Sequence, residues 1–345
     1  MLAPLINKKR TRSGGTMSKF SRAALLCLAF GAATLLSGFS PEQLKLTLAL
    51  QGTGTAKWEI AAMQELGLDK KHHLELTVND VADSPAGQVA LQAKAAEVIL
   101  SDFVWVNLQR HQGNMVTMVP HSLAVGGLMV DPKAGISSIA DLKGKAFAVS
   151  GSPVDKSFVI LAADYKKQTG GTLIDDADVK FGAPPLVNEL LVDGKAQADL
   201  NLWNWAARAK VAGMTQLTSV PDLFKDLGVS KTPPLLGWTF FDDVAKEKKK
   251  EIVAFLEASF ETKQALLTDD ALWDKIRPVM NVKDDDALFK QLRDDYRAGI
   301  VSSYVYSDME PAKQAFALMA QFGGKDVVGD VRDLDDGTFW KGFHK

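Results

Sequence analysis

Short apolar runs that alternate with helical patterns restrict the fold of this chain more than any other feature. Residues 44–50 (Leu-Lys-Leu-Thr-Leu-Ala-Leu) have a period of two, which is typical of a strand, and a helical pattern follows at residues 56–66. The same order of strand and helix recurs through residues 44–125 and 129–220, with strands expected over residues 146–150 and 198–202 and a helix from residue 154 to about residue 168. We therefore predict two α/β lobes, followed by a mostly helical tail from residue 244 onward that includes helices over residues 244–268 and 310–322.

The composition agrees with a globular protein and narrows its chemistry. Hydrophobic residues make up 46% and charged residues 24% of the 345 residues, which excludes disordered and collagen-like classes. The net charge of −2 gives no reason to expect nucleic acid as a partner. The single cysteine, Cys27, can form neither an internal disulfide nor a multi-thiolate metal site. We expect no metal and no cofactor.

The N-terminus has the layout of a secretory signal peptide. Residues 1–39 contain basic but no acidic side chains, and an uncharged apolar run at residues 23–36 precedes Ser37-Gly38-Phe39-Ser40. This run is shorter than the roughly 20 residues that span a bilayer. We predict a signal peptide over residues 1–39, starting at Met1 or Met17 and cleaved near Gly38 or Ser40. The alternative is a buried N-terminal helix.

Cleavage there would remove Cys27, leaving a secreted chain without a thiol and therefore without cysteine catalysis. Phe39 follows Leu36-Ser37-Gly38 where a lipoprotein signal needs cysteine, so we expect a periplasmic protein without a lipid anchor.

Four segments, taken in order, resemble a known family. They are Ala-Ala-Glu-Val-Ile-Leu-Ser-Asp (95–102), Asp-Leu-Lys-Gly-Lys-Ala-Phe-Ala-Val-Ser-Gly-Ser-Pro (141–153), Val-Asp-Gly-Lys-Ala-Gln-Ala-Asp-Leu-Asn-Leu-Trp (192–203) and Ala-Ala-Arg-Ala-Lys-Val-Ala-Gly (206–213). In this order the chain resembles periplasmic solute-binding proteins of ABC transporters, of the nitrate/sulfonate/taurine (NMT1/THI5-like) family, over most of residues 44–320. Many relatives carry Glu-Pro after the tryptophan, where this chain has Asn204-Trp205. The resemblance therefore does not identify the ligand.

The resemblance implies a two-lobed type II periplasmic binding protein fold. Residues 40–125 would begin lobe 1, residues 126–232 would form lobe 2, and residues 233–345 would return to lobe 1 and add the C-terminal helices. It also implies a small-molecule ligand between the lobes and an ABC permease of the inner membrane as partner. We expect a monomer.

Loops that follow strands are the first candidates for ligand binding, because ligands of α/β sheets bind beyond the carboxyl ends of the strands. Gly52 and Thr53 follow the first strand, and Ser150, Gly151 and Ser152 open lobe 2. Glycines allow close backbone approach, and the amides at a helix N-terminus favour an anionic group such as carboxylate or sulfonate. The alternative is that these loops are helix caps and nothing more.

Tryptophans near strand ends form the second group of candidates. Trp203, Asn204 and Trp205 place an amide between two aromatic faces, which suits a flat or cationic ligand. Trp58 and Trp105 are further candidates, and Trp238 is a weaker one. Ser101 and Asp102 end a strand, so Asp102 either faces the cleft or caps the next helix. Ordinary core packing is the alternative for each tryptophan.

The remaining polar residues do not indicate a metal-binding or catalytic site. His72-His73 is expected in solvent, and His111 and His121 have no metal ligand at the usual spacing. The charged residues 246–251 suit a solvated helix face, and the acidic residues 284–286 suit the start of a helix. Nucleophile, P-loop and zinc-protease motifs are absent from the sequence. We predict a binding protein for a small organic anion, with an aromatic group favoured by the tryptophans, and not an enzyme. The alternatives are a secreted sensor or accessory subunit of the same fold, or a pyrimidine-synthase-like enzyme.

Overall fold

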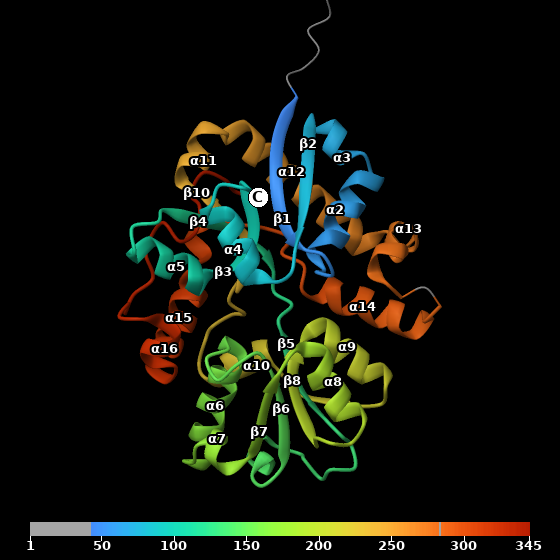
Figure 1. The fold of residues 1–345 in the computed structure, drawn as a ribbon, viewed down its shortest axis with the longest axis vertical. Coiled ribbons are helices and arrows are strands. Elements are labelled where there is room, and N and C mark those ends of the chain that lie inside the picture. Colours follow the sequence, from blue (N-terminus) through green and yellow to red (C-terminus); the bar gives the residue numbers. More distant parts are fainter. Residues whose placement is uncertain (1–42, 283) are drawn as a thin grey trace, which may run out of the picture. The chain divides into compact units, whose positions relative to one another are not determined.

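The computed structural model describes residues 43–282 and 284–345 (Figure 1). The predicted signal peptide, the choice of start residue and Cys27 lie outside these residues. The described strands form two five-stranded sheets. The first sheet has the order β2-β1-β3-β10-β4 and consists of β1 (Leu44–Gln51), β2 (Leu74–Val81), β3 (Val98–Asp102), β4 (Val116–Ser122) and β10 (Leu236–Phe241). The second has the order β7-β6-β8-β5-β9 and consists of β5 (Gly126–Val130), β6 (Ala146–Ser150), β7 (Asp178–Gly182), β8 (Ala198–Leu202) and β9 (Thr215–Ser219).

The two sheets repeat one plan, although the sequence shows no internal repeat. In each, four strands run in one direction, and one antiparallel strand, β10 or β5, lies between the central strand and the last strand of the sheet. Glu97 accepts a hydrogen bond from the Thr47 amide at 2.6 Å, and Gln197 accepts one from the Ala146 amide at 2.8 Å, at matching positions of the two sheets. Each side chain directly precedes the central strand of its sheet, β3 or β8, and links the start of that strand to the neighbouring parallel strand.

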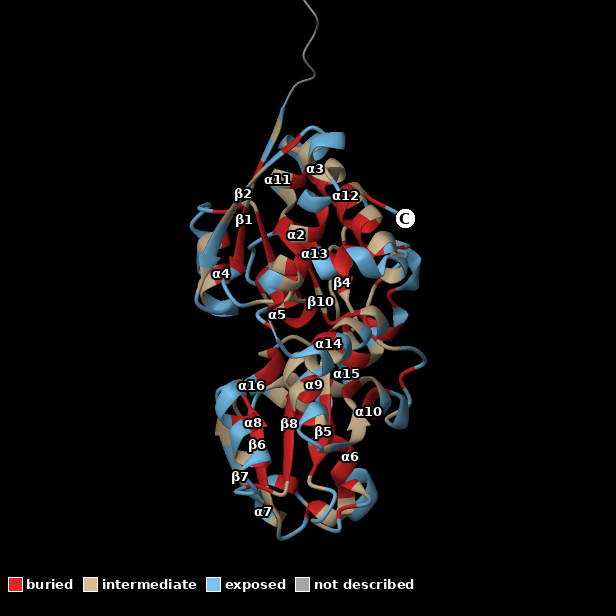
Figure 2. Ribbon diagram, turned by 90° about the vertical axis from the view of Figure 1, so that its right-hand side faces the viewer, coloured by how far each residue is buried: buried red, intermediate tan, exposed pale blue. Residues whose placement is uncertain are grey.

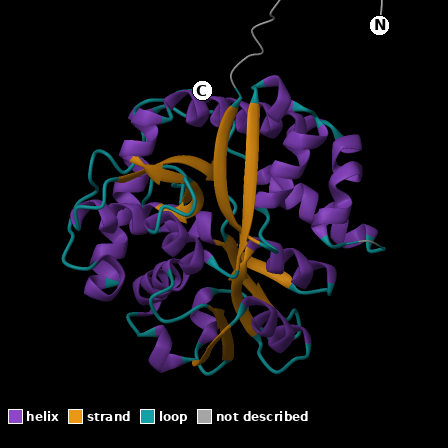
Figure 3. Cartoon of the chain, turned by 45° about the horizontal axis from the view of Figure 1, so that its top comes forward, coloured by secondary structure: helices purple, strands orange, loops and turns teal. Residues whose placement is uncertain are grey.

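Helices flank the two sheets, and the region after β10 is mostly helical, as predicted (Figure 3). Those that follow strands of the two sheets are α2 (Ala56–Glu65), α3 (Leu68–Lys71), α4 (Ser84–Gln92), α5 (Phe103–His111), α6 (Lys156–Thr169), α7 (Leu173–Asp176), α8 (Pro184–Val192), α9 (Trp203–Val211) and α10 (Val220–Asp226). The C-terminal ones are α11 (Asp242–Glu247), α12 (Lys249–Thr268), α13 (Asp270–Met280), α14 (Asp286–Ala298), α15 (Glu310–Phe322) and α16 (Gly324–Val328). Two 3₁₀ turns, η1 (Ile139–Leu142) and η2 (Tyr306–Asp308), complete the regular elements of the described residues.

The inner strands of both sheets and β4 are largely buried, as expected where helices cover a sheet, whereas the edge strands β2, β7 and β9 are mostly half-buried or exposed (Figure 2). Apolar residues make up most of this buried surface, but the acidic residue Asp199 of β8 is fully buried as well. Asp199 pairs with Ala148 in register, and at the matching place in the first sheet Ile99 pairs with Ala49. A carboxyl group therefore occupies a core position that the sister lobe fills with isoleucine.

The chain passes between the sheets twice. It leaves the first sheet after Ser122 and enters the second at Gly126, and it returns through the segment between α10 and β10. Gly126 has a φ of 142°, and a Cβ there would lie 2.0 Å from the Asn201 carbonyl oxygen. Only glycine fits this first crossover.

Several elements differ from the sequence prediction. No bounds were predicted for the helix after Asp102. This helix, α5, begins directly after β3 because the Asp102 side chain accepts a hydrogen bond from the Trp105 amide. The expected helix over residues 244–268 is broken into α11 and α12 at Lys248, where the backbone leaves the helical region. Helix α6 begins at Lys156 and not at Val154, since Asp155 is its N-cap.

Among the described residues, no helix combines the length and the apolar character that crossing a membrane requires.

Candidate functional site

The loops at the carboxyl ends of β3 and β6 meet across the two lobes. Asp102 ends β3 in the first sheet, and Lys156 begins α6 after β6 in the second. Lys156 Nζ lies 3.3 Å from Asp102 Oδ2, and the two side chains keep 36% and 22% of their surface exposed. The carboxyl ends of two strands from different sheets thus face each other, which is where ligands of α/β proteins bind.

Asp102 performs two tasks at once. Its Oδ1 accepts a hydrogen bond from the Trp105 amide at 2.9 Å and caps α5, while its Oδ2 contacts Lys156 of the other lobe. The preceding residue, Ser101, is buried and accepts a hydrogen bond from Gln88 Nε2 at 3.1 Å. The sequence left open whether Asp102 faces the cleft or caps the next helix. In the structure it caps α5, and its second carboxylate oxygen contacts Lys156.

Lys156 and Asp155 were missed by the sequence analysis. Asp155 caps α6 by accepting hydrogen bonds from the Ser157 and Phe158 amides, and burial raises the pKa of its carboxyl group. The charge of Asp102 raises the pKa of Lys156, so the ammonium stays protonated at neutral pH. The available signal was the pair Asp155-Lys156 after Ser-Gly-Ser-Pro, because aspartate is a strong N-cap.

The other predicted residues of this loop precede the cap. Ser150 is the last, buried residue of β6, and Gly151 has a φ of 99° and is exposed. Ser152 is half-buried, and its carbonyl accepts a hydrogen bond from the Asp155 amide at 2.9 Å. Because the Asp155 side chain takes the first amides of α6, those amides are not free for an anion.

The loop after β1 is exposed at Gly52 and Thr53. It is held to the end of β2, since Lys57 Nζ contacts Asp80 Oδ1 at 2.7 Å and the Gly52 amide donates to the Val81 carbonyl at 3.1 Å. No side chain caps α2, whose N-cap residue is Thr55. The first turn of α2 therefore differs from those of α5 and α6, which aspartates cap.

Trp58 and Trp203 contact each other across the lobes. Trp58 of α2 is 4% exposed, and its ring lies edge-on to Trp203 of α9 with 5.8 Å between centroids. Tyr296 of α14 packs against both rings at 5.9 Å. Lys210 of α9 adds an ion pair to Asp295 of α14 at 3.1 Å. The structure thus places these two tryptophans in packed contacts between α2, α9 and α14.

Trp205, Asn204 and Trp105 lie in the first turns of α9 and α5. Arg208 packs over the Trp205 ring at 4.8 Å and donates a hydrogen bond to the Asn204 carbonyl. Trp105 is half-buried and packs against the main core cluster. Trp238 lies inside β10, fully buried, and donates a hydrogen bond to Ser259. Its expected place near a strand end was therefore wrong.

A cavity of about 220 Å³ lies beside the first crossover. Its lining includes Val125 and Gly126 of the crossover, Trp203, and the ion pair of Lys210 and Asp295. The cavity thus places Trp203, one of the predicted site residues, beside the first crossover. Within residues 43–282 and 284–345, no group of three potential metal-ligating side chains is present.

The sequence model of the family described as NMT1/THI5 like matches residues 59–270. The chain belongs to the NMT1/THI5-like family. The predicted family is therefore confirmed. No protein of curated function matches the chain in sequence.

Solved structures share the fold of this NMT1/THI5-like chain at low sequence identity. The alkanesulfonate-binding protein SsuA from Xanthomonas axonopodis pv. citri, bound to MOPS, is 15% identical, with a TM-score of 0.65 over 87% of this chain and 99% of that chain. The periplasmic aliphatic sulphonate binding protein SsuA from Escherichia coli is 14% identical, with a TM-score of 0.63 over 85% and 93%. The desulfurization enzyme DSZB is 13% identical, with a TM-score of 0.57 over 81% and 92%.

These matches and the two sheets confirm the predicted two-lobed periplasmic binding protein fold with a helical C-terminal region. At such identities the likeness shows the fold alone, and binding proteins and an enzyme both occur on it.

Proposed function

We propose that this protein is the periplasmic solute-binding component of an ABC importer and that it captures a small organic anion between its lobes. The observation that carries the proposal is the contact of Lys156 with Asp102, at the facing carboxyl ends of strands from both sheets. Family membership and the sulfonate-binding names of two structural relatives support the same function.

The charge of the proposed ligand follows from the groups at this contact. Asp102 already serves as the cap of α5, so its carboxylate is engaged by a backbone amide whether or not Lys156 is near. Lys156 has no such second partner among the described residues and can turn to an anionic ligand. Carboxylate and sulfonate groups form strong charge-assisted hydrogen bonds with ammonium groups.

The binding site would draw on the predicted loops. Gly52 and Thr53 border the uncapped first turn of α2, and Asn204 lies in the first turn of α9, which no side chain caps either. Amides at these turns add donors to an anion held by Lys156. The lobes would hinge at the two crossovers, and the packed rings of Trp58 and Trp203 would limit how far they part.

The partners follow from this function. The signal peptide predicted at residues 1–39 would deliver the chain to the periplasm, and a permease of the inner membrane would receive the ligand-bound form. The protein would act as a monomer.

The experiment is a ligand screen on the chain beginning at Ser40, by thermal shift and small-angle scattering. The panel contains ethanesulfonate, MOPS, benzenesulfonate and benzoate, with benzamide as the neutral control. We expect at least one anion, and not benzamide, to raise the melting temperature and to make the protein more compact. If no anion does either, the proposal is wrong.

Uptake of the labelled anion by cells with and without the gene distinguishes transport from sensing, and consumption of the anion by purified protein would indicate an enzyme.

Replacing Lys156 with methionine is expected to weaken binding of that anion by about tenfold or more. A hydrogen bond to a charged group contributes roughly 1.5–3 kcal/mol, and methionine keeps the length of the side chain without the charge. Isothermal titration calorimetry measures the change. Lys166→Met removes the same charge from the exposed end of the same helix and should leave the affinity unchanged. Equal affinities of the Lys156 variant and wild type would move the anion site elsewhere.

A further inference from the structure

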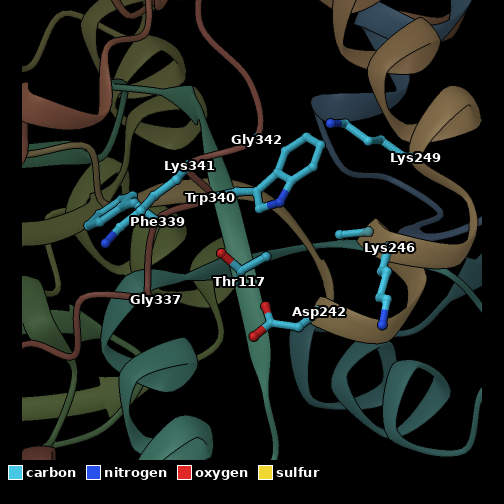
Figure 4. Close-up of a pocket in the computed structure, with 10 residues that line it drawn as sticks. Thr117, Asp242, Lys246, Lys249, Gly337, Phe339, Trp340, Lys341 and Gly342 are labelled. Atoms are coloured by element: carbon cyan, nitrogen blue, oxygen red, sulfur yellow. The ribbon is translucent and has the colours of Figure 1, made fainter.

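A second cavity lies at the opposite edge of the first sheet. It has a volume of about 440 Å³ and is formed by the start of β4, helices α11 and α12, and the C-terminal segment (Figure 4). Strand β10 is antiparallel to β3, with Leu236 opposite Asp102, so Phe241 and Asp242 lie at the end of the sheet away from Asp102. The cavity is therefore separate from the contact of Lys156 with Asp102.

The C-terminal segment builds one wall of this cavity. The Met118 amide donates to the Thr338 carbonyl at 3.0 Å, and the Trp340 amide donates to the Met118 carbonyl at 2.9 Å, so the segment pairs with β4. The Trp340 ring packs edge-on against Phe240 with 5.3 Å between centroids. At Gly342 a Cβ would lie 2.4 Å from the Trp340 ring, so the lack of a side chain there lets the indole keep this position.

A polar group lines the cavity without a partner. Thr117 of β4 is 1% exposed, and its Oγ1 has no hydrogen-bond partner among the described residues. Buried hydroxyl groups are rarely left without a partner in folded proteins, and such a group calls for an explanation. A bound molecule with a hydrogen-bonding group at this end of the cavity would supply one.

The charges at the cavity favour an anion. Lys246 and Lys249 form no ion pair with any described residue, and both line the cavity. The single carboxylate of the lining, Asp242, is engaged by Arg110 at 3.0 Å. The third lysine, Lys341, lies over the Tyr306 ring at 4.6 Å. Two ammonium groups of the lining thus remain without an opposite charge, in a cavity that the half-buried Trp340 indole also lines.

We propose that this cavity is a second binding site, for a small organic anion with a flat apolar body. The anionic group would contact Lys246 and Lys249, the apolar body would pack on Trp340, and a polar atom would reach Thr117. A volume of 440 Å³ lies within the usual range for small-molecule sites, about 300–1,000 Å³. The sequence had suggested only a solvated helix face at residues 246–251. That suggestion misses the break at Lys248 and the C-terminal segment beside it.

The test follows the indole resonance of Trp340 by ¹H–¹⁵N NMR. The resonance is assigned by its loss in Trp340→Phe, and the probe is naphthalene-2-sulfonate, with 2-naphthalenemethanol as the neutral control. We expect a saturable shift with the sulfonate, which higher salt weakens, and a dissociation constant roughly tenfold larger in the double variant Lys246→Met/Lys249→Met. The variant Lys290→Met/Lys313→Met removes two exposed lysines of α14 and α15 and should bind as wild type does.

The same titration in Lys156→Met separates this site from the proposed function. The shift of Trp340 should persist there, whether or not the cleft binds an anion. A shift that disappears in Lys156→Met would overturn the second site, because the resonance would then report binding between the lobes. No saturable shift, an unchanged dissociation constant in the Lys246/Lys249 variant, or equal binding of the neutral control would also overturn it.

Discussion

Replacing Glu59 with alanine is expected to lower the free energy of unfolding by about 3–5 kcal/mol at pH 7.5. Glu59 of α2 is fully buried and pairs with Lys263 of α12, which is 1% exposed, at 3.1 Å. Ser259 donates to Glu59 and accepts from Lys263 and Trp238, so the pair is part of a buried network. Removing the carboxylate would leave an ammonium group in the core without its counter-charge.

The pH dependence of the variant gives a second readout. Burial already lowers the pKa of Lys263, and the charge of Glu59 opposes this effect. Without Glu59 the folded pKa falls further below the unfolded one, so the unfolded chain binds the proton more tightly. Stability of Glu59→Ala should therefore rise from neutral pH toward pH 10, more steeply than that of wild type.

Urea unfolding measures both effects. In the double variant Glu59→Leu/Lys263→Met neither charge remains, and we expect it to recover most of the loss. A single variant that loses less than about 1 kcal/mol would contradict this account of the network. So would a double variant whose loss equals the sum of the two single losses, because the two charges would then be independent.

The sequence did not reveal this network. Glu59 looks like an acidic residue in the first turn of a helix, and His121 looked isolated because no ligand lies at close spacing. In the fold, His121 Nδ1 lies 3.4 Å from Glu59 Oε2, with its ring 4.6 Å from Trp238. Burial and the nearby Lys263 lower the pKa of His121, so it stays neutral. Partners about 60 to 200 positions apart are set by tertiary packing, and local pattern gives no access to them.

Helices and strands were easier to predict from the sequence than this network, since periodicity is a local property. Strands β6 and β8 and helix α15 have the bounds that the pattern predicted. The bounds of helix α5 were not predicted because Phe-Val-Trp-Val combines residues that favour strands, and the capping role of Asp102 decides in favour of a helix. Of the two residues of the proposed anion site, the sequence offered Asp102 as a candidate but not Lys156, because only the packing of the two lobes brings them together.

Replacing Asp199 with asparagine is expected to stabilise the protein by about 4 kcal/mol at pH 8 and by less than about 1 kcal/mol at pH 4. Asp199 is fully buried, and its Oδ1 has no hydrogen-bond partner among the described residues. Only a long contact of 3.4 Å joins Oδ2 to Asn201. Burial raises the pKa of Asp199 from 3.8 to about 7.

The direction in which stability changes with pH follows from proton binding to Asp199. Between about pH 4 and pH 7 the folded protein keeps a proton on Asp199 that the unfolded chain releases, so stability falls as the pH rises through this range. Above pH 7 both states are ionised and this contribution stays constant. Asparagine has nearly the same shape and no charge in either state, so the variant should lack this pH dependence.

Urea unfolding of wild type and Asp199→Asn at several values between pH 4 and pH 8 measures the difference. The control Asp193→Asn removes an exposed carboxylate of the same lobe, paired with Lys195, and should keep the wild-type profile. A stability difference between Asp199→Asn and wild type that stays the same at pH 4 and pH 8 would contradict the raised pKa. A difference that grows with pH would mean that lobe 2 carries a buried carboxyl group, at the position of Ile99 in lobe 1, at the expense of its own stability near neutral pH.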